Sequence, residues 1–248
     1  MIMNKINDYK EISPLIFKYF KRGVITNNFL TPKDYRCEIS EGNFFYIADE
    51  DYLNLFVKRD NFFRLYFYVL DENVIFREID AKIVCDIAGI SETLLLNNNF
   101  IKALERVQLK YNSEKEGIAS YFKAKKEDAE EVFKLMENCF DKYTGYSPNL
   151  TQLKEECEEG VIYKEVIDGR IAGVLRAGKS SKISSVKHLC VSEEFRGKGI
   201  AKKLCREFLN ENTNAIVWTG KENTSAISLY KSLGFSESGL KSTVYMKG

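Results

Sequence analysis

The sequence has 248 residues, of which 44% are hydrophobic and 13% aromatic, enough to bury one large core or two of ordinary size. The 37 Lys and Arg residues nearly balance 36 Asp and Glu residues, so the formal net charge is +1 and the chain lacks the basic excess of a nucleic-acid binder. A charged fraction of 29%, three prolines and a mean hydropathy of -0.30 argue against a disordered chain.

The start of the chain has no apolar core of the signal-peptide type, and no run approaches the roughly 18 apolar residues of a membrane helix. The cysteines are scattered, with no Cys-x-x-Cys pair: Cys37, Cys85, Cys139, Cys157, Cys190 and Cys205. We therefore expect a cytoplasmic protein with free thiols. The only histidine, His188, excludes a His-rich zinc site, and we expect no metal.

The first half of the chain is poor in glycine and rich in Phe and Tyr. An amphipathic helix is predicted over residues 9–19, interrupted by Pro14, and three strands follow it over 44–49, 52–58 and 63–70. No glycine-rich loop comes after the third of these strands. The polar stretch Asn112–Gly117 then marks the predicted boundary between domains 1–114 and 115–248.

The second half holds most of the glycines and alternates strands with helices. Strands are predicted near 118–124, 161–167, 170–178, 183–191, 214–220 and 242–247, and helices near 125–140, 152–158, 200–211 and 223–235. Asp168-Gly169 predicts a tight hairpin between the second and third strands. This order indicates an α/β (α+β) domain, a mixed central sheet flanked by helices.

The ends of the two halves resemble each other. When Phe100 is set against Phe235, Asn99 falls on Gly234. Asn tolerates the left-handed conformation better than most residues, so Asn99 could end a helix as Gly234 does. The match indicates an internal duplication, that is, tandem domains of one fold, with chance similarity of short helix–turn–strand units as the alternative.

The most specific motif is the run Arg-Gly-Lys-Gly-Ile-Ala at 196–201, between a predicted strand and a predicted helix. Backbone N–H groups at a helix start are unpaired and carry partial positive charge, and glycines let a phosphate approach them closely. The motif fits neither the dinucleotide fingerprint nor the nucleoside-triphosphate loop. An ordinary glycine turn before a surface helix is the alternative interpretation.

These residues resemble the GNAT (Gcn5-related) N-acetyltransferases. HLCVSEEFRGKGIAKKL is similar to the acetyl-CoA motif of that family, and ENTSAISLYKSLGF to its second motif, so the resemblance covers about residues 117 to 248. It implies backbone pairing of one strand with the pantetheine arm, a pyrophosphate held by the glycine loop, and an asparagine beside the pantetheine. The implied cofactor-binding residues are Leu189, Cys190, Val191, Arg196, Gly197, Lys198, Gly199, Ile200, Ala201 and Asn223.

The resemblance also implies catalytic roles. Tyr230 matches the tyrosine that protonates the departing CoA thiolate, although a core aromatic is the plainer interpretation. His188 is the candidate general base, with a backbone-bonded strand histidine as the alternative. Glu165 is a further candidate, because Trp218 stands where some relatives carry a glutamate. Cys190 is assigned no nucleophilic role, since direct transfer is expected.

The resemblance therefore implies an acetyl-CoA-dependent N-acetyltransferase that moves an acetyl group directly to a primary amine of a small molecule or peptide. A catalytically idle acyl-CoA-binding or regulatory protein is the alternative. The first half is expected to be a degenerate GNAT-like domain that does not bind acetyl-CoA productively and covers the acceptor side, or else an unrelated recognition domain. No nucleic-acid or membrane partner is expected, and the oligomeric state is left open. The acidic run Glu155–Glu159 could attract a cationic amine or simply be a solvated helix face.

Overall fold

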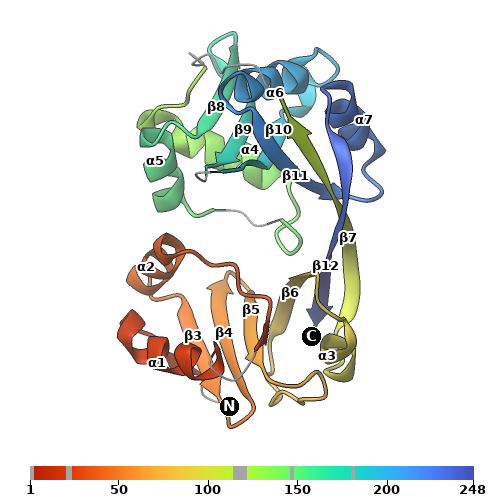
Figure 1. The fold of residues 1–248 in the computed structure, drawn as a ribbon. Helices are drawn as coiled ribbons and strands as arrows, with labels where there is room; N and C mark the ends of the chain where they lie inside the picture. The colour runs from red at the N-terminus through yellow and green to blue at the C-terminus, as the bar shows by residue number, and fades with distance from the viewer. Residues whose placement is uncertain (1–2, 21–23, 114–121, 146–147, 180–181) are drawn as a thin grey trace. The chain divides into compact units, whose positions relative to one another are not determined.

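The computed structural model describes residues 3–20, 24–113, 122–145, 148–179 and 182–248, and the chain forms two compact units (Figure 1). Unit 1 comprises Met1–Glu105 together with Lys241–Gly248, and unit 2 comprises Arg106–Leu240. The predicted boundary between residues 114 and 115 differs from this division, because the sequence does not reveal that the end of the chain returns to unit 1. Residues 114–117 of the predicted linker lie outside the described residues.

Unit 1 is a mixed sheet with strand order β1-β3-β4-β5-β6-β12, and β2 pairs with β5 beside this path. Its elements are β1 (Asn4–Lys5), α1 (Tyr9–Phe20), β2 (Ile25–Thr26), α2 (Pro32–Ser40), β3 (Phe44–Ala48), β4 (Tyr52–Arg59), β5 (Phe62–Val69), β6 (Lys82–Ala88), α3 (Thr93–Asn97) and the start of β7 (Ile101–Asn112). The three strands predicted from sequence are β3, β4 and β5. The helix α1 runs through Pro14 without interruption. The elements β2 and α2 were not predicted from the sequence.

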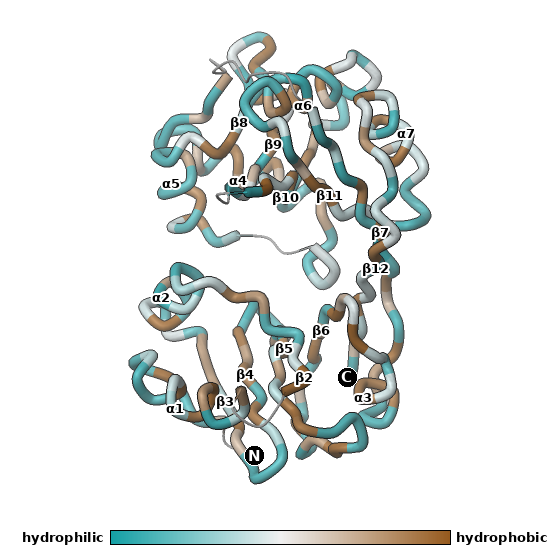
Figure 2. Tube along the Cα trace, viewed as in Figure 1, coloured by the Kyte–Doolittle hydropathy of each residue, from teal (hydrophilic) through white to brown (hydrophobic). Residues whose placement is uncertain are grey.

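Strands β4 and β5 form the centre of the unit 1 sheet, and side chains on both of their faces are apolar and buried. Leu55 belongs to the cluster that packs under α1, whereas its neighbour Phe56 belongs to the cluster that includes Leu94 of α3. This double burial is typical of a central strand. Hydrophobic stretches follow these strands in Figure 2, and hydrophilic residues lie on the outer turns of the helices.

Unit 2 is a mixed sheet with strand order β7-β11-β10-β9-β8. Its elements are a short 3-10 helix (Lys126–Asp128), α4 (Ala129–Cys139), α5 (Leu150–Glu158), β8 (Ile162–Ile167), β9 (Arg170–Gly178), β10 (Ser184–Val191), a second 3-10 turn (Glu193–Phe195), α6 (Ile200–Glu211), β11 (Asn214–Gly220), α7 (Thr224–Ser232) and the start of β12 (Ser236–Lys247). The predicted hairpin between β8 and β9 is confirmed, with φ of 51° at Asp168 and 76° at Gly169. Of the predicted strand 118–124, residues 118–121 lie outside the described residues.

Helices cover both faces of this sheet. A Cβ on Gly173 of β9 would meet Ile200 and Leu204 of α6, so that face lies under α6. The next residue, Val174, is paired with Cys190 of β10, and His188, on the same face of β10 as Cys190, packs against Phe140 at the end of α4. Since side chains alternate across a strand, α4 covers the opposite face from α6.

The two units exchange their last strands. The second half of β7 pairs with β11 in unit 2, and residues 242–247 of β12 pair with β6 in unit 1. The turns before these strands carry the same hydrogen bonds. Phe100 N–H donates to Leu95 O at 2.9 Å, and Phe235 N–H donates to Tyr230 O at 3.1 Å. Asn99 has the positive φ expected of it, 62°. This repetition of geometry supports the predicted duplication.

Candidate functional site

Strand β10 is paired on both edges only at its start. Ser184–Val186 pair in parallel with Ala215–Val217 of β11, and a register irregularity follows between Val186 and His188. From His188 to Val191, β10 pairs with β9 alone among the described strands. The edge that faces away from β9 therefore leaves backbone hydrogen-bonding groups of Leu189–Val191 available to an extended ligand, except Val191 O, which accepts from Arg196 Nε at 3.4 Å and from the Cys139 thiol at 3.8 Å. We refer to this edge as the strand gap.

The strand gap leads into the glycine loop that the sequence singled out. Gly197 and Gly199 have φ of 76° and 79°, and a Cβ on either would meet nothing within 4 Å. Gly199 is the N-cap of the twelve-residue helix α6, and Lys203 N–H makes the first helical bond, to Gly199 O, at 3.0 Å. The earlier N–H groups of α6 thus lie at an open helix start, and Lys198 adds positive charge there. The loop can therefore hold an anion.

Tyr230 lies on α7 and is 4% exposed. Its ring packs edge-on against Phe235 at a centroid distance of 5.3 Å. Burial, and secondarily the nearby Cys205 of α6, raises the pKa of Tyr230 well above its ordinary value. The phenol therefore keeps its proton throughout the neutral range and can serve only as a proton donor there.

Asn223 begins α7 and caps it. Its side-chain oxygen accepts a hydrogen bond from Ala226 N–H at 3.1 Å. The carboxamide oxygen thus accepts one hydrogen bond within the chain, and the NH₂ group of this exposed side chain supplies two donors.

His188 lies at the start of the strand gap, on the face covered by α4. It is buried, and its ring meets that of Phe140 edge-on at a centroid distance of 4.9 Å. Nη1 of Arg176 lies 3.4 Å from Nδ1 of His188. A guanidinium has no acceptor, so a hydrogen bond at this contact requires Nδ1 to accept and the ring proton to be on Nε2.

Arg176 is itself held by a buried carboxylate. It is fully buried, and its Nε and Nη2 atoms bond to the two oxygens of Glu156 at 2.6 and 2.7 Å. Gln152 donates to the same carboxylate at 3.3 Å. Glu156 of the acidic run is therefore buried and paired, whereas its neighbour Glu155 is exposed, as expected of a solvated helix face. The pair of Arg176 with Glu156 was not predicted, although a charged residue such as Arg176 inside the apolar strand β9 indicates a buried partner.

Of the remaining candidates, Glu165 lies away from the strand gap, whereas Trp218 directly follows Val217, the last residue of β11 that pairs with β10. Glu165 is on β8, separated from β10 by β9, and its carboxylate is bound to Lys203 Nζ at 2.7 Å. Trp218 on β11 is paired with Gln108 of β7. No group of three His, Cys, Asp or Glu side chains in the described ranges could hold a metal ion.

Unit 1 contains a counterpart of the strand gap, and it is filled. β5 pairs in parallel with β6 over Phe62–Leu65, as β10 does with β11. Beyond Leu65, β2 pairs with β5, and the Asn27 side chain that follows β2 bridges β5 and β6. Its NH₂ donates to Leu65 O at 3.1 Å and Asp86 O at 3.0 Å, and its oxygen accepts from Phe67 N–H at 2.7 Å. The groups that are available in unit 2 are thus satisfied in unit 1 by the chain itself.

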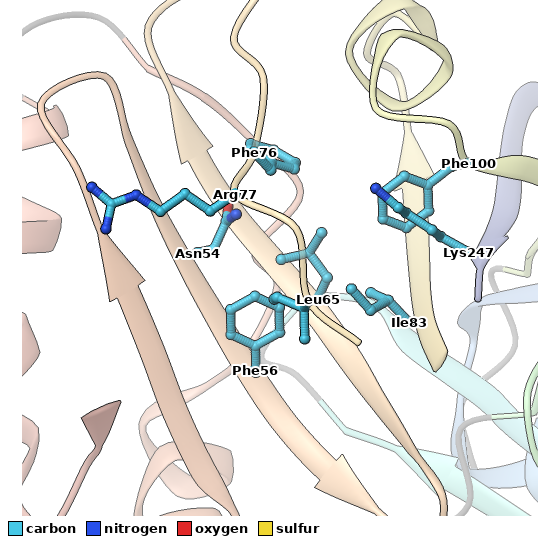
Figure 3. A pocket seen from close by; sticks show the side chains of 9 residues that line it. Asn54, Phe56, Leu65, Phe76, Arg77, Ile83, Phe100 and Lys247 are labelled. Atoms are coloured by element: carbon cyan, nitrogen blue, oxygen red, sulfur yellow. The ribbon is translucent and has the colours of Figure 1, made fainter. Parts of the chain in front are cut away.

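Unit 1 also contains a small cavity, which is lined in part by Phe76, Arg77 and Ile79 of the segment between β5 and β6 (Figure 3). It encloses about 250 Å³ of empty space, part of it open to solvent. Its walls are mainly apolar, and the side-chain oxygen of Asn54 is buried there without a hydrogen-bond partner in the described residues. The lining residues are Asn54, Phe56, Leu65, Phe76, Arg77, Ile79, Ile83, Phe100 and Lys247. No glycine loop or helix start adjoins this cavity.

The strand gap and the glycine loop define an α/β domain in which an open strand edge leads into a glycine loop at the start of a helix. Residues 158–237 match the family model described as an acetyltransferase (GNAT) domain. This segment spans β8 to β11 with α6 and α7. This part of unit 2 therefore matches a GNAT domain, in agreement with the resemblance seen in the sequence.

Two curated relatives match the chain over short segments. N-acetylaspartate synthetase of Xenopus tropicalis is 30% identical over 82 residues, which cover 30% of each protein. N-alpha-acetyltransferase RimI of Mycobacterium tuberculosis is 31% identical over 77 residues, or 30% of this chain and 49% of RimI. The chain thus spans less than half the length of either relative.

Solved structures show the fold over a longer range. An acetyltransferase of the GNAT family from Colwellia psychrerythraea covers 99% of both chains, with a TM-score of 0.56 and 12% identity. A tandem GNAT protein from the clavulanic acid biosynthesis pathway covers 82% of both chains, with a TM-score of 0.52 and 11% identity. These likenesses concern the fold alone, and they confirm the predicted tandem architecture. Among the described residues, no helix is long and apolar enough to cross a membrane.

Proposed function

We propose that unit 2 binds acetyl-CoA and transfers its acetyl group to an amine. The observation that carries the proposal is the open edge of β10 leading directly into the glycine loop at the start of α6. Leu189–Val191 would pair with the pantetheine arm through backbone groups. The N–H groups from Gly197 to Ala201, with Arg196 and Lys198, would hold the pyrophosphate. GNAT proteins generally use acetyl-CoA, and the open space above both glycines fits a phosphate.

The proposed chemistry needs three contributions from the chain. The thioester supplies an activated acetyl group, and the strand gap would orient it toward a neutral amine. A backbone N–H of β10 at the gap would polarise the carbonyl. Tyr230, kept protonated by burial, would give its proton to the departing thiolate.

His188 is kept in the proposed site with a changed role. Its position at the start of the gap suits contact with the reacting groups, but Arg176 already occupies Nδ1. We therefore infer that His188 acts as a hydrogen-bond donor through Nε2–H, and that the amine loses its proton to water rather than to this ring. Glu156 and Arg176 would fix the ring in that state.

The pH dependence of turnover distinguishes donor from base. His188→Ala is expected to lower kcat about tenfold, the loss of one useful hydrogen bond, and to keep the acidic limb of the pH–rate profile. The limb is kept because it reflects protonation of the acceptor amine. Steady-state rates from pH 5.5 to 9.5 would measure this, and loss of the acidic limb in the variant would restore His188 as the base.

The acceptor class follows from the names of the relatives. N-acetylaspartate synthetase and N-alpha-acetyltransferase RimI both describe acetyl transfer to nitrogen. We propose a primary amine of an amino acid, another small molecule or a peptide as the acceptor. Thiol release from acetyl-CoA, measured over a panel of free amino acids, polyamines and peptides, tests this. Saturable binding of acetyl-CoA with no thiol release above hydrolysis by any amine would favour the idle acyl-CoA-binding protein.

We propose one acetyl-CoA site per chain. Asn27 satisfies in unit 1 the strand groups that unit 2 offers to a ligand, and no helix in the described part of unit 1 begins at a glycine-rich loop. Isothermal titration calorimetry with acetyl-CoA is expected to give a stoichiometry of about one. A stoichiometry near two, with two saturable sites, would contradict the assignment of unit 1 as a non-binding copy.

A further inference from the structure

Two cysteines meet on the α4 face of unit 2, beside the strand gap but outside the proposed transfer chemistry. Cys139, the last residue of α4, packs against the buried cluster that contains Cys190 of β10. The Cys139 thiol donates to Val191 O, the backbone oxygen of the residue after Cys190, at 3.8 Å, and Arg196 Nε donates to the same oxygen at 3.4 Å. Cys139 is half-buried, whereas Cys190 is buried. A peroxide could therefore reach Cys139 first.

We propose that Cys139 and Cys190 form a peroxide-reactive thiol pair, in which Cys139 is oxidised and Cys190 closes a disulfide with it. The pair has the two features that such sites require: a partly accessible sulfur beside a cation, and a second thiol already in contact to resolve the oxidised form. The proposal stands apart from the acetyl-transfer function, because it concerns only the chemistry of the two sulfurs.

The electrostatics of the pair support this assignment of roles. The hydrogen bond from Cys190, and then the Arg196 guanidinium, lower the pKa of the Cys139 thiol to about 6, against the opposing effect of burial. The same contact, together with burial, raises the pKa of Cys190. The opposite directions of the two pKa shifts make Cys139 the thiol of the pair that ionises more readily. The thiolate is the nucleophile.

The reaction balances with hydrogen peroxide as the oxidant. The Cys139 thiolate attacks one peroxide oxygen, the O–O bond breaks, and hydroxide leaves as Cys139 becomes a sulfenic acid. The Cys190 sulfur then attacks the Cys139 sulfur, the S–O bond breaks, and the departing hydroxide takes the Cys190 proton to form water. Two thiols and one peroxide give one disulfide and two waters, and the two electrons pass from sulfur to peroxide oxygen.

Other cysteines of the chain provide internal controls. Burial raises the pKa of Cys157 to about 11 and that of Cys205 to about 12. Both are buried and should remain thiols under conditions that oxidise Cys139. Cys37, the other half-buried cysteine, is replaced by Ser in every variant so that oxidation between molecules does not confuse the result.

The experiment treats the full chain with hydrogen peroxide at pH 7 and maps the cysteines by mass spectrometry. We expect a loss of 2 Da (approximately two hydrogens), a linked peptide pair containing Cys139 and Cys190, and recovery of both thiols with dithiothreitol. Cys190→Ala should leave a Cys139 sulfenic acid that dimedone traps, and Cys139→Ala should give neither product. Oxidation of Cys139 no faster than that of Cys157 or Cys205 would overturn the proposal, as would failure to link it to Cys190.

A second measurement tests the thiolate directly. Alkylation of Cys139 by iodoacetamide should reach half its maximal rate near pH 6 in the protein with Cys190 intact. Loss of the Cys190 donor in Cys190→Ala should move this midpoint to higher pH, because the first cause of the lowered pKa is removed. A midpoint that is the same in both proteins, or that lies near the ordinary thiol value in the intact pair, would contradict the pairing.

Discussion

Gly199→Asp is expected to weaken acetyl-CoA binding by at least about tenfold while the chain stays folded. The substitution places a carboxylate at the start of α6, where the pyrophosphate is proposed to bind. The negative charges of the carboxylate and the pyrophosphate would repel each other. The chain should tolerate it, because a Cβ at Gly199 meets nothing within 4 Å and Asp accepts a positive φ better than most residues. Asp is also a favoured N-cap residue. Titration calorimetry and thermal unfolding would measure both effects.

Two matched variants separate charge from backbone strain. Gly199→Asn adds a side chain of the same size without charge and should weaken binding less than Gly199→Asp. Gly160→Asp introduces the same residue at a positive φ of 65° with equally open surroundings, far along the chain from the loop, and should bind acetyl-CoA as the unaltered protein does. An unchanged dissociation constant in Gly199→Asp would remove the loop from the cofactor site.

Tyr230→Phe is expected to lower kcat by a factor of about 100 or more and to leave acetyl-CoA affinity unchanged. The ring stays in its packed position against Phe235, so only the hydroxyl proton is lost. Because burial already raises the pKa of Tyr230, the unaltered enzyme should show no loss of rate from Tyr230 ionisation within the neutral range. Stopped-time thiol release and calorimetry give the two quantities.

Tyr111→Phe is the matched control for this change. Tyr111 packs on the same Phe235 ring at a centroid distance of 5.3 Å but lies on β7 rather than α7. Removal of its hydroxyl should leave kcat within about twofold of the unaltered value, as expected of a residue outside the chemistry. A Tyr230→Phe variant with normal turnover would mean that the phenol is only a core aromatic.

The elements of unit 2 were accessible from sequence because their signals are local. The ends of β9 fall where its continuous buried run begins and stops, and those of β11 where its alternation begins and stops. Asp168-Gly169 forms the turn that its dipeptide indicates. The glycine loop was found for the same reason, since a positive φ at Gly197 and Gly199 leaves a residue-level trace in the sequence.

The strand exchange left no such trace. Residues 242–247 form a good strand in either unit, and nothing local distinguishes a partner at β6 from one nearer in the chain. The predicted division at residues 114 and 115 therefore differs from the observed units. The role of Asn27 in filling the unit 1 counterpart of the strand gap was not predicted, because β2 is only two residues long. The Asn27 side chain also bonds to strands about forty to sixty residues away in the sequence.

The role of His188 also depended on contacts that the sequence does not display. Its neighbour Arg176 is twelve residues away on β9, and Glu156 approaches from α5. The sequence placed a histidine beside the proposed cofactor strand but could not show which ring nitrogen was occupied. The same holds for Cys139 and Cys190, which were scattered cysteines until α4 brought them together.

The central claim is that acetyl-CoA lies along the open edge of β10 in unit 2 and nowhere in unit 1. An electron-density map of crystals grown with acetyl-CoA tests it most directly. We expect density for the pantetheine arm beside Leu189–Val191, the pyrophosphate at the N–H groups of Gly197–Ala201, and the thioester within reach of Tyr230. Density in unit 1, or a pyrophosphate away from the start of α6, would contradict the claim.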